Sequence, residues 1–229
     1  MALCIIPARS GSKRIPNKNI KNFFGKPMIA WAIGLAYESG CFDEVVVSTD
    51  TLEIKDIAEK FGAQVPFLRP KYLADDYSST LAVIRHAMSF YPAETEICCL
   101  YPASPLICVE DLREGFRKLK SCDFAMPVTS YAHPIERALL INQRGFGEMA
   151  RMENYSARSQ DLTEYYHDVG AFYWGLREAW LTFDNPFEAN VGFVTIPRYR
   201  AQDIDTPEDW KFAEYLVSYR DALQMPVIK

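Results

Sequence analysis

Hydrophobic residues occur along the first 130 positions in short continuous runs, and these runs alternate with longer amphipathic segments. The runs at 3–7, 43–50, 63–69, 95–104 and 123–130 predict buried β-strands, because a strand covered on both faces of a parallel sheet needs no polar side. The segments at 28–39, 51–62, 79–91 and 109–121 have the apolar spacing of helices. This regular alternation indicates an α/β fold with a doubly wound, mainly parallel sheet.

The pattern changes after about residue 131. The segment 137–150 is expected to form a hairpin around Arg144 and Gly145, and 151–167 is polar without clear periodicity. Strands at 170–176 and 191–197 return to the core, and 206–223 forms a last helix with Thr206 as its N-cap. We therefore expect one domain over residues 1–229, with an inserted lobe or arm at about 131–167 that forms either a dimer contact or a lid.

Composition and charge narrow the class of protein. The chain has 229 residues, of which 49% are hydrophobic and 24% charged, as expected for a globular protein with a full core. Its net charge of −5 argues against a nucleic-acid partner, and no apolar run is long enough to span a membrane. The six cysteines show no metal-binding spacing, and the N-terminus has no signal-peptide pattern. The sequence predicts a cytoplasmic protein with reduced thiols.

One loop has the opposite charge to the rest of the chain. The stretch "ARSGSKRIPNKN", residues 8–19, follows the first strand and carries Arg9, Lys13, Arg14 and Lys18 but no acid. Such a loop can direct backbone N–H groups at an anion, and its cations suit a triphosphate. Neither the Walker A nor the Rossmann glycine pattern is present. A solvated basic loop is the alternative, but a position at the carboxyl end of a strand favours phosphate binding.

Asp203 and Asp205 form a second candidate feature, just before the last helix. In an extended segment these two side chains share a face and repel each other, unless a cation lies between them. Mg²⁺ often takes one or two carboxylates and completes its shell with phosphate oxygens and water. Alternatively, Asp205 caps the helix and Asp203 is solvated. Together with the basic loop, the pair predicts nucleotidyl transfer.

Six segments also carry a family resemblance, and they run in order over essentially the whole chain. They are "IIPARSGSKRIPNKNI", "GKPMIAWAI", "VVVSTD", "LRPKYLADDYSST", "YPASPL" and "DIDTPEDW". This set resembles the cytidylyltransferases that activate eight- and nine-carbon acidic sugars. The resemblance implies a fold of the nucleotide-diphospho-sugar transferase type. It also implies a Mg²⁺-dependent reaction in which CTP and a sugar acid give a CMP-sugar and pyrophosphate.

The branch of the family is suggested by "VPFLRPKYLADD", "NYSARSQDLTEYYHDVGAFYWG" and "IPRYRAQDIDTPEDW", which are most similar to pseudaminic acid cytidylyltransferases. CMP-sialic acid synthetases typically have Gln in place of Tyr101, and an Arg that contacts the sugar carboxylate in place of His167. Pseudaminic acid, a nine-carbon acidic sugar, is therefore the expected acceptor. Sialic and legionaminic acids remain alternatives, and a non-catalytic nucleotide-sugar-binding regulator is a remote one.

The resemblance also implies residue roles. Nucleotide binding falls to Arg9, Ser12, Lys13, Lys18, Asn19, Arg69, Ser78, Ser79 and Thr80. Sugar binding falls to Tyr101, Ser104, Arg158, Gln160, His167 and Asp168. Asp203 and Asp205 would bind Mg²⁺ and act in catalysis with Arg9 and Lys18.

Some assignments stay open at this point. Tyr101 and Gln160 could instead pack in the core or in an interface, and His86 is expected to be a helix-surface or core histidine. No general base is identified, with the two aspartates and His167 as candidates. A homodimer is implied, in which the arm reaches the neighbouring subunit.

Overall fold

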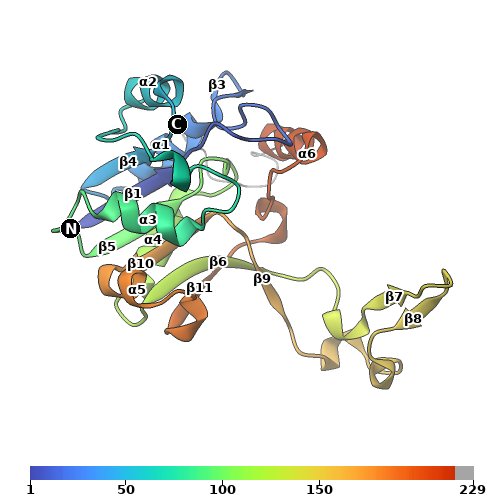
Figure 1. The fold of residues 1–229 in the computed structure, drawn as a ribbon. Helices are drawn as coiled ribbons and strands as arrows, with labels where there is room; N and C mark the ends of the chain where they lie inside the picture. Colours follow the sequence, from blue (N-terminus) through green and yellow to red (C-terminus); the bar gives the residue numbers. More distant parts are fainter. Residues whose placement is uncertain (220–229) are drawn as a thin grey trace.

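A seven-stranded sheet lies at the centre of the computed structural model, which describes residues 1–219 (Figure 1). Across the sheet, the strands are β4 (Glu44–Ser48), β1 (Ala2–Pro7), β5 (Glu96–Leu100), β10 (Phe172–Leu176), β6 (Phe124–Ser130) and β11 (Val191–Thr195), and β9 (Tyr166–Asp168) also pairs with β6. β4, β1 and β5 are parallel, β11 is parallel to β6, and β10 runs antiparallel between β5 and β6. The predicted mainly parallel sheet is confirmed.

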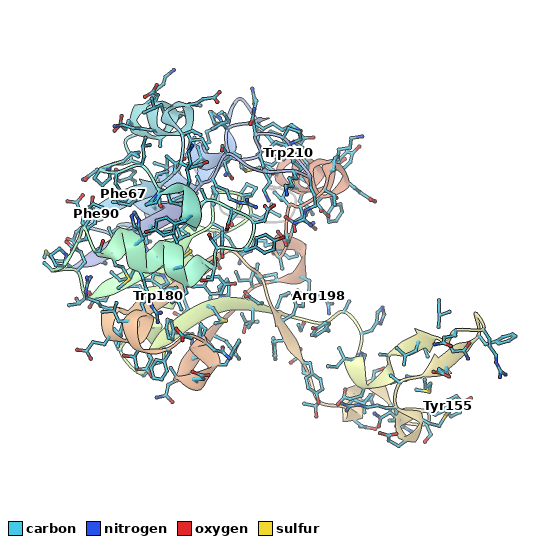
Figure 2. All side chains as sticks on the ribbon, viewed as in Figure 1. Phe67, Phe90, Tyr155, Trp180, Arg198 and Trp210 are labelled. Atoms are coloured by element: carbon cyan, nitrogen blue, oxygen red, sulfur yellow. The ribbon has the colours of Figure 1, made fainter. Side chains whose placement is uncertain are left out.

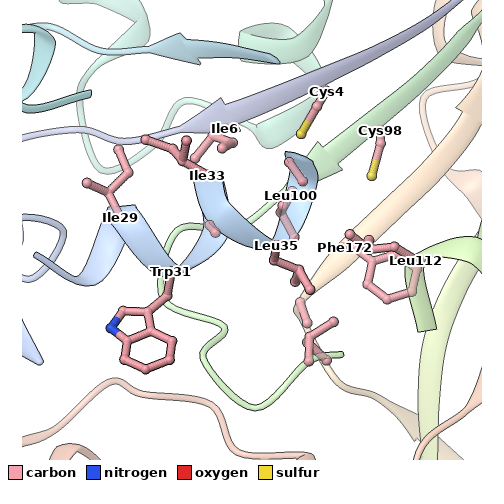
Figure 3. Close-up of a cluster of buried hydrophobic side chains, with 14 of the residues drawn as sticks. Cys4, Ile6, Ile29, Trp31, Ile33, Leu35, Cys98, Leu100, Leu112 and Phe172 are labelled. Carbon is pink, nitrogen blue, oxygen red and sulfur yellow. The ribbon is translucent and has the colours of Figure 1, made fainter. Parts of the chain in front are cut away.

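Helices cover both faces of this sheet. They are α1 (Met28–Ser39), α2 (Leu52–Lys60), α3 (Thr80–Met88), α4 (Val109–Lys118), α5 (Arg177–Thr182) and α6 (Pro207–Ser218). Side chains alternate along β1, so that Cys4 and Ile6 join the cluster containing Ile33 of α1 and Leu112 of α4 (Figure 3). Leu3 and Ile5 point the other way, into the cluster with α3 and α5. No helix within residues 1–219 has both the length and the apolar character needed to cross a membrane.

The predicted ends of two helices correspond to real caps. Gly40 follows α1 with a positive φ of 63°, a conformation that glycine adopts without strain. Thr206 caps α6, where its hydroxyl accepts a hydrogen bond from the Asp209 backbone, and the Asp209 side chain completes a capping box. The last part of the helix expected at 206–223, residues 220–223, lies outside the described residues.

The prediction of a continuous strand at 63–69 is wrong. This segment forms only two isolated parallel bridges, Val46 with Gln64 and Thr49 with Leu68, and lies beside the edge strand β4. Three residue steps separate the bridges on one side and four on the other, so the register slips and no ladder forms. Pro66 lies between them and has no N–H to donate. The irregular segment carries Arg69 to the carboxyl end of β4.

The segment after β6 forms an arm that stands away from the sheet (Figures 1 and 2). β6 and β9 pair antiparallel at its base, and β7 (Leu139–Ile141) and β8 (Gly147–Met149) form the predicted hairpin. Gly145 turns this hairpin with a φ of 80°. Short 3-10 turns occur at Ile135–Arg137, Met152–Asn154 and Ser159–Asp161 in the arm, and at Lys71–Leu73, Pro186–Glu188 and Arg198–Arg200 elsewhere, while β2 (Asn22–Phe23) and β3 (Lys26–Pro27) form a small ribbon.

Candidate active site

A pocket of about 640 Å³ opens at the carboxyl ends of β1 and β5. This volume is in the range of small-molecule sites, and the position is the usual ligand edge of a doubly wound sheet. The residues predicted from the sequence that line it are Arg9, Ser12, Lys13, Lys18, Asn19, Arg69, Ser78, Thr80, Tyr101, Asp203 and Asp205. The fold thus brings the basic loop and the aspartate pair to one place.

Lys18 joins these two features directly. Its Nζ donates to the Ile204 carbonyl at 2.7 Å and lies 3.3 Å from Asp205 Oδ1, across a sequence separation of 186 residues or more. Arg14 Nη2 pairs with the other Asp205 oxygen at 2.7 Å. Asn19 is buried and its amide donates to the Arg9 carbonyl at 2.9 Å, which fixes the shape of the loop.

Asp76 forms a second charged cluster with two other cations of the same loop. Arg9 Nη1 lies 2.7 Å from Asp76 Oδ1, and Lys13 pairs with Oδ2. Hydrogen bonds from Lys13 and Arg9 hold the pKa of Asp76 below its usual value. Asp76, Arg14 and Tyr173 all line the pocket without having been assigned from the sequence. For Asp76 the available signal is the acid pair inside the segment "LADDYSST", directly before the serines and the threonine to which nucleotide binding is assigned.

Asp203 and Asp205 differ in their surroundings. Ile204 between them is fully buried, so the two aspartates flank an anchored residue and both reach the pocket. The ion pairs go to Asp205, and within residues 1–219 none goes to Asp203. Partial burial among the pocket walls, followed by the charge of Asp205, raises the pKa of Asp203 although the residue remains exposed. A cation beside Asp203 would relieve this cost.

The aspartate pair fits a hard divalent cation that takes most of its ligands from phosphate oxygens and water. In the described part of the chain, no group of three or more His, Cys, Asp or Glu residues could hold a metal ion by itself. Two carboxylates are sufficient for Mg²⁺ where phosphate oxygens and water complete its octahedral shell. The donor set therefore matches a metal bound together with a nucleotide.

Arg69 forms a buried part of the pocket wall. Its Nε donates to Ser48 Oγ at 3.0 Å, a second guanidinium nitrogen donates to the Ser48 carbonyl, and the residue is 5% exposed. Burial lowers its pKa to about 10, so it stays charged at neutral pH. Ser78 also lines the pocket, but Ser79 does not, because Ser79 Oγ accepts from the Ala82 backbone and caps α3.

Tyr101 is the predicted sugar residue that lines the pocket. Its hydroxyl lies 2.5 Å from Thr80 Oγ1, its ring contacts Tyr173 edge to face, and burial raises its pKa. Asp168 lies behind Tyr173 and accepts a hydrogen bond from its hydroxyl. Ser104 is buried and lines a small neighbouring cavity together with Asp203.

The other predicted sugar residues do not reach this pocket within one chain. Arg158 and Gln160 are exposed on the arm, in the turn near Ser159–Asp161. At the base of the arm, the His167 ring packs against the Tyr131 ring with 5.0 Å between the ring centres, and His167 Nδ1 lies 2.9 Å from the Asp168 carbonyl oxygen. His86, expected to be a helix-surface or core histidine, is half-buried on α3 and packs edge to face on Phe67.

Known proteins resemble this chain in sequence and in fold. A family model described as Cytidylyltransferase matches residues 3–166. A pseudaminic acid cytidylyltransferase from Campylobacter jejuni is 44% identical over 93% of this chain and 95% of that protein. A CMP-N,N'-diacetyllegionaminic acid synthase from Legionella pneumophila is 32% identical over 94% and 95%. A CMP:2-keto-3-deoxy-manno-octonic acid synthetase solved with CTP superimposes with a TM-score of 0.68 and 21% identity, covering 96% of this chain and 99% of the other.

Proposed function

The chain belongs to the cytidylyltransferase family, and from this premise we propose that it transfers the cytidylyl group of CTP to pseudaminic acid, giving CMP-pseudaminic acid and pyrophosphate. Identity is higher to the pseudaminic acid enzyme, at 44%, than to the legionaminic acid synthase, at 32%. The structural observation that carries the proposal is the convergence of the basic loop and the aspartate pair in one pocket. This convergence supports a nucleotidyltransferase over a non-catalytic binding protein.

In the proposed reaction, the anomeric hydroxyl of the sugar acid attacks the α-phosphorus of CTP, in line with departing pyrophosphate. A bond forms between the sugar oxygen and the α-phosphorus, the bond from the α-phosphorus to the oxygen bridging it to the β-phosphate breaks, and the hydroxyl proton passes to a base, for which Asp203, Asp205 and His167 are the candidates. The protein contributes mainly position and charge, as is general for phosphoryl transfer. Arg9, Lys13 and Lys18 face the pocket from one loop and would neutralise the triphosphate, with Lys18 and Arg9 stabilising charge on the transferred and leaving groups.

Other pocket residues would hold the rest of the nucleotide. Ser12 and Asn19 belong to the same loop, and Arg69, Ser78 and Thr80 line the wall where cytosine and ribose are proposed to bind. Ser79 would support this wall indirectly, since it caps the helix that begins at Thr80. Arg69 is 5% exposed, and in such a weakly hydrated position its hydrogen bonds to a ligand would be stronger than in water.

Asp203 and Asp205 are proposed to bind Mg²⁺ together with the triphosphate. When bound, the ion would offset charge on the phosphate oxygens and polarise the reacting groups. Lys18 would keep the segment in place through the Ile204 carbonyl. In the structure Arg14 pairs with Asp205, so cation and nucleotide would have to displace this contact.

The sugar is proposed to bind beside Tyr101 and Thr80, with Ser104 and Asp168 nearby. Arg158, Gln160 and His167 would complete this side from the arm, and for them a second subunit is needed. The arm exposes Leu139, Ile141 and Phe146 by 73%, 83% and 67%, and a solvent-exposed apolar hairpin of this kind is typical of a protein contact. We therefore propose a homodimer in which each arm contacts the other subunit. Use of CTP and six free cysteines suit a cytoplasmic enzyme.

The direct test supplies CTP and Mg²⁺ with pseudaminic, legionaminic or sialic acid and measures pyrophosphate release. We expect the highest kcat/KM with pseudaminic acid and no release without a sugar acid. A higher value with either of the other acids would replace the proposed acceptor but leave the chemistry intact. No release with any of the three would contradict the proposed function as a whole.

A further inference from the structure

A buried ion pair lies behind the aspartates and involves neither the loop nor the arm. Arg200 precedes Asp203 by three residues, and its guanidinium meets both carboxylate oxygens of Asp111, with Nη2 donating to Oδ1 at 3.0 Å and Nη1 pairing with Oδ2. The side chains of Arg200 and Asp111 are only 10% and 8% exposed. Two parallel bonds between planar groups fix orientation as well as distance. The pair is thus a rigid link between the turn at Arg198–Arg200 and helix α4.

Asp111 is itself held in place. It lies in the first turn of α4, and its Oδ2 accepts from the Cys108 backbone at 2.9 Å and lies 3.0 Å from the Cys108 thiol. Burial, followed by the charge of Asp111, raises the pKa of Cys108, so the thiol stays protonated and can donate. The helix therefore presents a fixed carboxylate to Arg200.

The link acts on the segment that carries the two aspartates. Arg200 and Asp203 line the same small cavity, and Gln202 donates to the Asp203 carbonyl at 2.7 Å. On the pocket side, Lys18 holds the Ile204 carbonyl. Asp209 Oδ2 accepts from the Asp205 backbone at 3.1 Å. Arg200 thus anchors the chain just before Asp203, and Lys18 anchors it between the two aspartates.

We propose that Arg200, through Asp111, is a positioning residue that sets the placement of Asp203 and Asp205 and thereby the affinity for a divalent cation bound with CTP. This inference rests on the proposed function. A buried ion pair is weak evidence for stability, because desolvation of two charges offsets much of their attraction. The Arg200–Asp111 pair is directional, and it lies close in sequence to two carboxylates that are proposed to share one cation. This favours a role in positioning those carboxylates. Partners of metal ligands typically change metal affinity by about 10- to 100-fold when they are mutated.

The test measures CTP binding by calorimetry without any sugar, once with Mg²⁺ and once with EDTA. Arg200→Lys keeps the charge but cannot form the paired bonds, and Asp111→Asn keeps the shape and one acceptor oxygen. For both variants we expect the gain in CTP affinity that Mg²⁺ provides to fall by about tenfold. The affinity measured in EDTA is expected to change less than twofold.

Arg177→Lys is the matched control. Arg177 is also partly buried and donates to the Tyr91 and Met88 carbonyls at 2.8 and 3.0 Å, but it does not line the pocket. We expect it to lower the melting temperature and to leave both CTP affinities unchanged.

Three results would overturn the positioning role: a Mg²⁺ effect that matches wild type in both variants, equal losses with and without Mg²⁺, or loss of the folded state in both variants. A wild-type protein that binds no CTP would instead refute the proposed function. The two failures can therefore be told apart.

Discussion

The two sides of the pocket are built differently. On the nucleotide side, residues from the 8–19 loop, Arg69, Thr80 and the aspartate pair line the pocket within one chain, and ion pairs from Arg14 and Lys18 join the loop to Asp205. Of the sugar residues predicted from the sequence, Tyr101 lines the pocket, while Arg158 and Gln160 lie exposed on the arm. Phosphate chemistry needs several charges close together, and the loops at one sheet edge supply them. Sugar selection is proposed to need a second chain.

Loss of Lys18 should have the largest effect on the nucleotide side. In Lys18→Ala, the contacts with Asp205 and the Ile204 carbonyl disappear together with the charge proposed to stabilise the phosphate. We expect kcat to fall by about 10²- to 10³-fold, the size seen when one charge-stabilising donor is removed. The measurement is pyrophosphate release at saturating substrates.

Lys21→Ala is the matched control, because Lys21 Nζ lies 4.4 Å from the centre of the Trp210 ring and does not line the pocket. It should retain turnover near wild type. Equal turnover in the two variants would remove Lys18 from the phosphate role.

Asp203→Asn should separate activity from stability. Because the pKa of Asp203 is raised in the folded protein, its ionised form opposes folding above that pKa, and this cost disappears as the pH falls through it. The Asp203→Asn variant should therefore have a higher melting temperature than wild type at pH 7 in EDTA, while its Mg²⁺-dependent turnover falls by about 10²-fold. A melting temperature below that of wild type at pH 7 would contradict the charge assignment.

Asp205→Asn should change the melting temperature in the opposite direction. Asp205 pairs with Arg14 and Lys18, so removing its charge should lower the melting temperature as well as turnover. Melting curves of both variants over a descending pH series test this difference, which should shrink as the pH falls through the raised pKa of wild-type Asp203.

The arm predicts a smaller effect, confined to the sugar. Arg158→Ala should raise KM for the sugar acid by about tenfold through loss of a charged hydrogen bond, with KM for CTP unchanged. At a sugar concentration well below KM, mixing it with Lys18→Ala and allowing subunits to exchange should give about a quarter of wild-type activity, well above the mean of the two variants measured separately, if each site joins a loop from one subunit to an arm from the other. If activity does not recover although subunit exchange is verified, Arg158 acts at the site of its own subunit or has no role in sugar binding.

Asp76→Asn should give the smallest change, and of opposite sign. Arg9 and Lys13 pair with Asp76 in the absence of nucleotide, and a triphosphate would have to compete with it. Because exposed ion pairs contribute little, KM for CTP should fall by about two- to fivefold, and less at high salt. A rise in KM for CTP would mean that Asp76 instead orients the two cations for the nucleotide.

The sequence was most informative where one local rule decides the outcome. Alternating buried runs predicted the sheet, and the spacing of Asp203 and Asp205 predicted that both reach one pocket. It failed where long-range contacts decide. The register slip beside β4 depends on two distant bridges, and the antiparallel entry of β10 depends on the path of the whole arm.

The same limit applies to individual side chains of the site. Ser79 has a residue type suited to a ligand, but it satisfies the backbone of α3. The Asp111–Arg200 pair joins residues 89 positions apart, and neither residue has a local motif that would suggest it. Such pairs become apparent only when the fold places the partners together.

A crystal structure with CMP-pseudaminic acid and Mg²⁺ is the decisive test of this composite site. We expect the nucleotide phosphate between the 8–19 loop and Asp203, and the sugar beside Tyr101 with the partner subunit's arm over it. A nucleotide bound outside this pocket, or a metal held without Asp203 and Asp205, would contradict it.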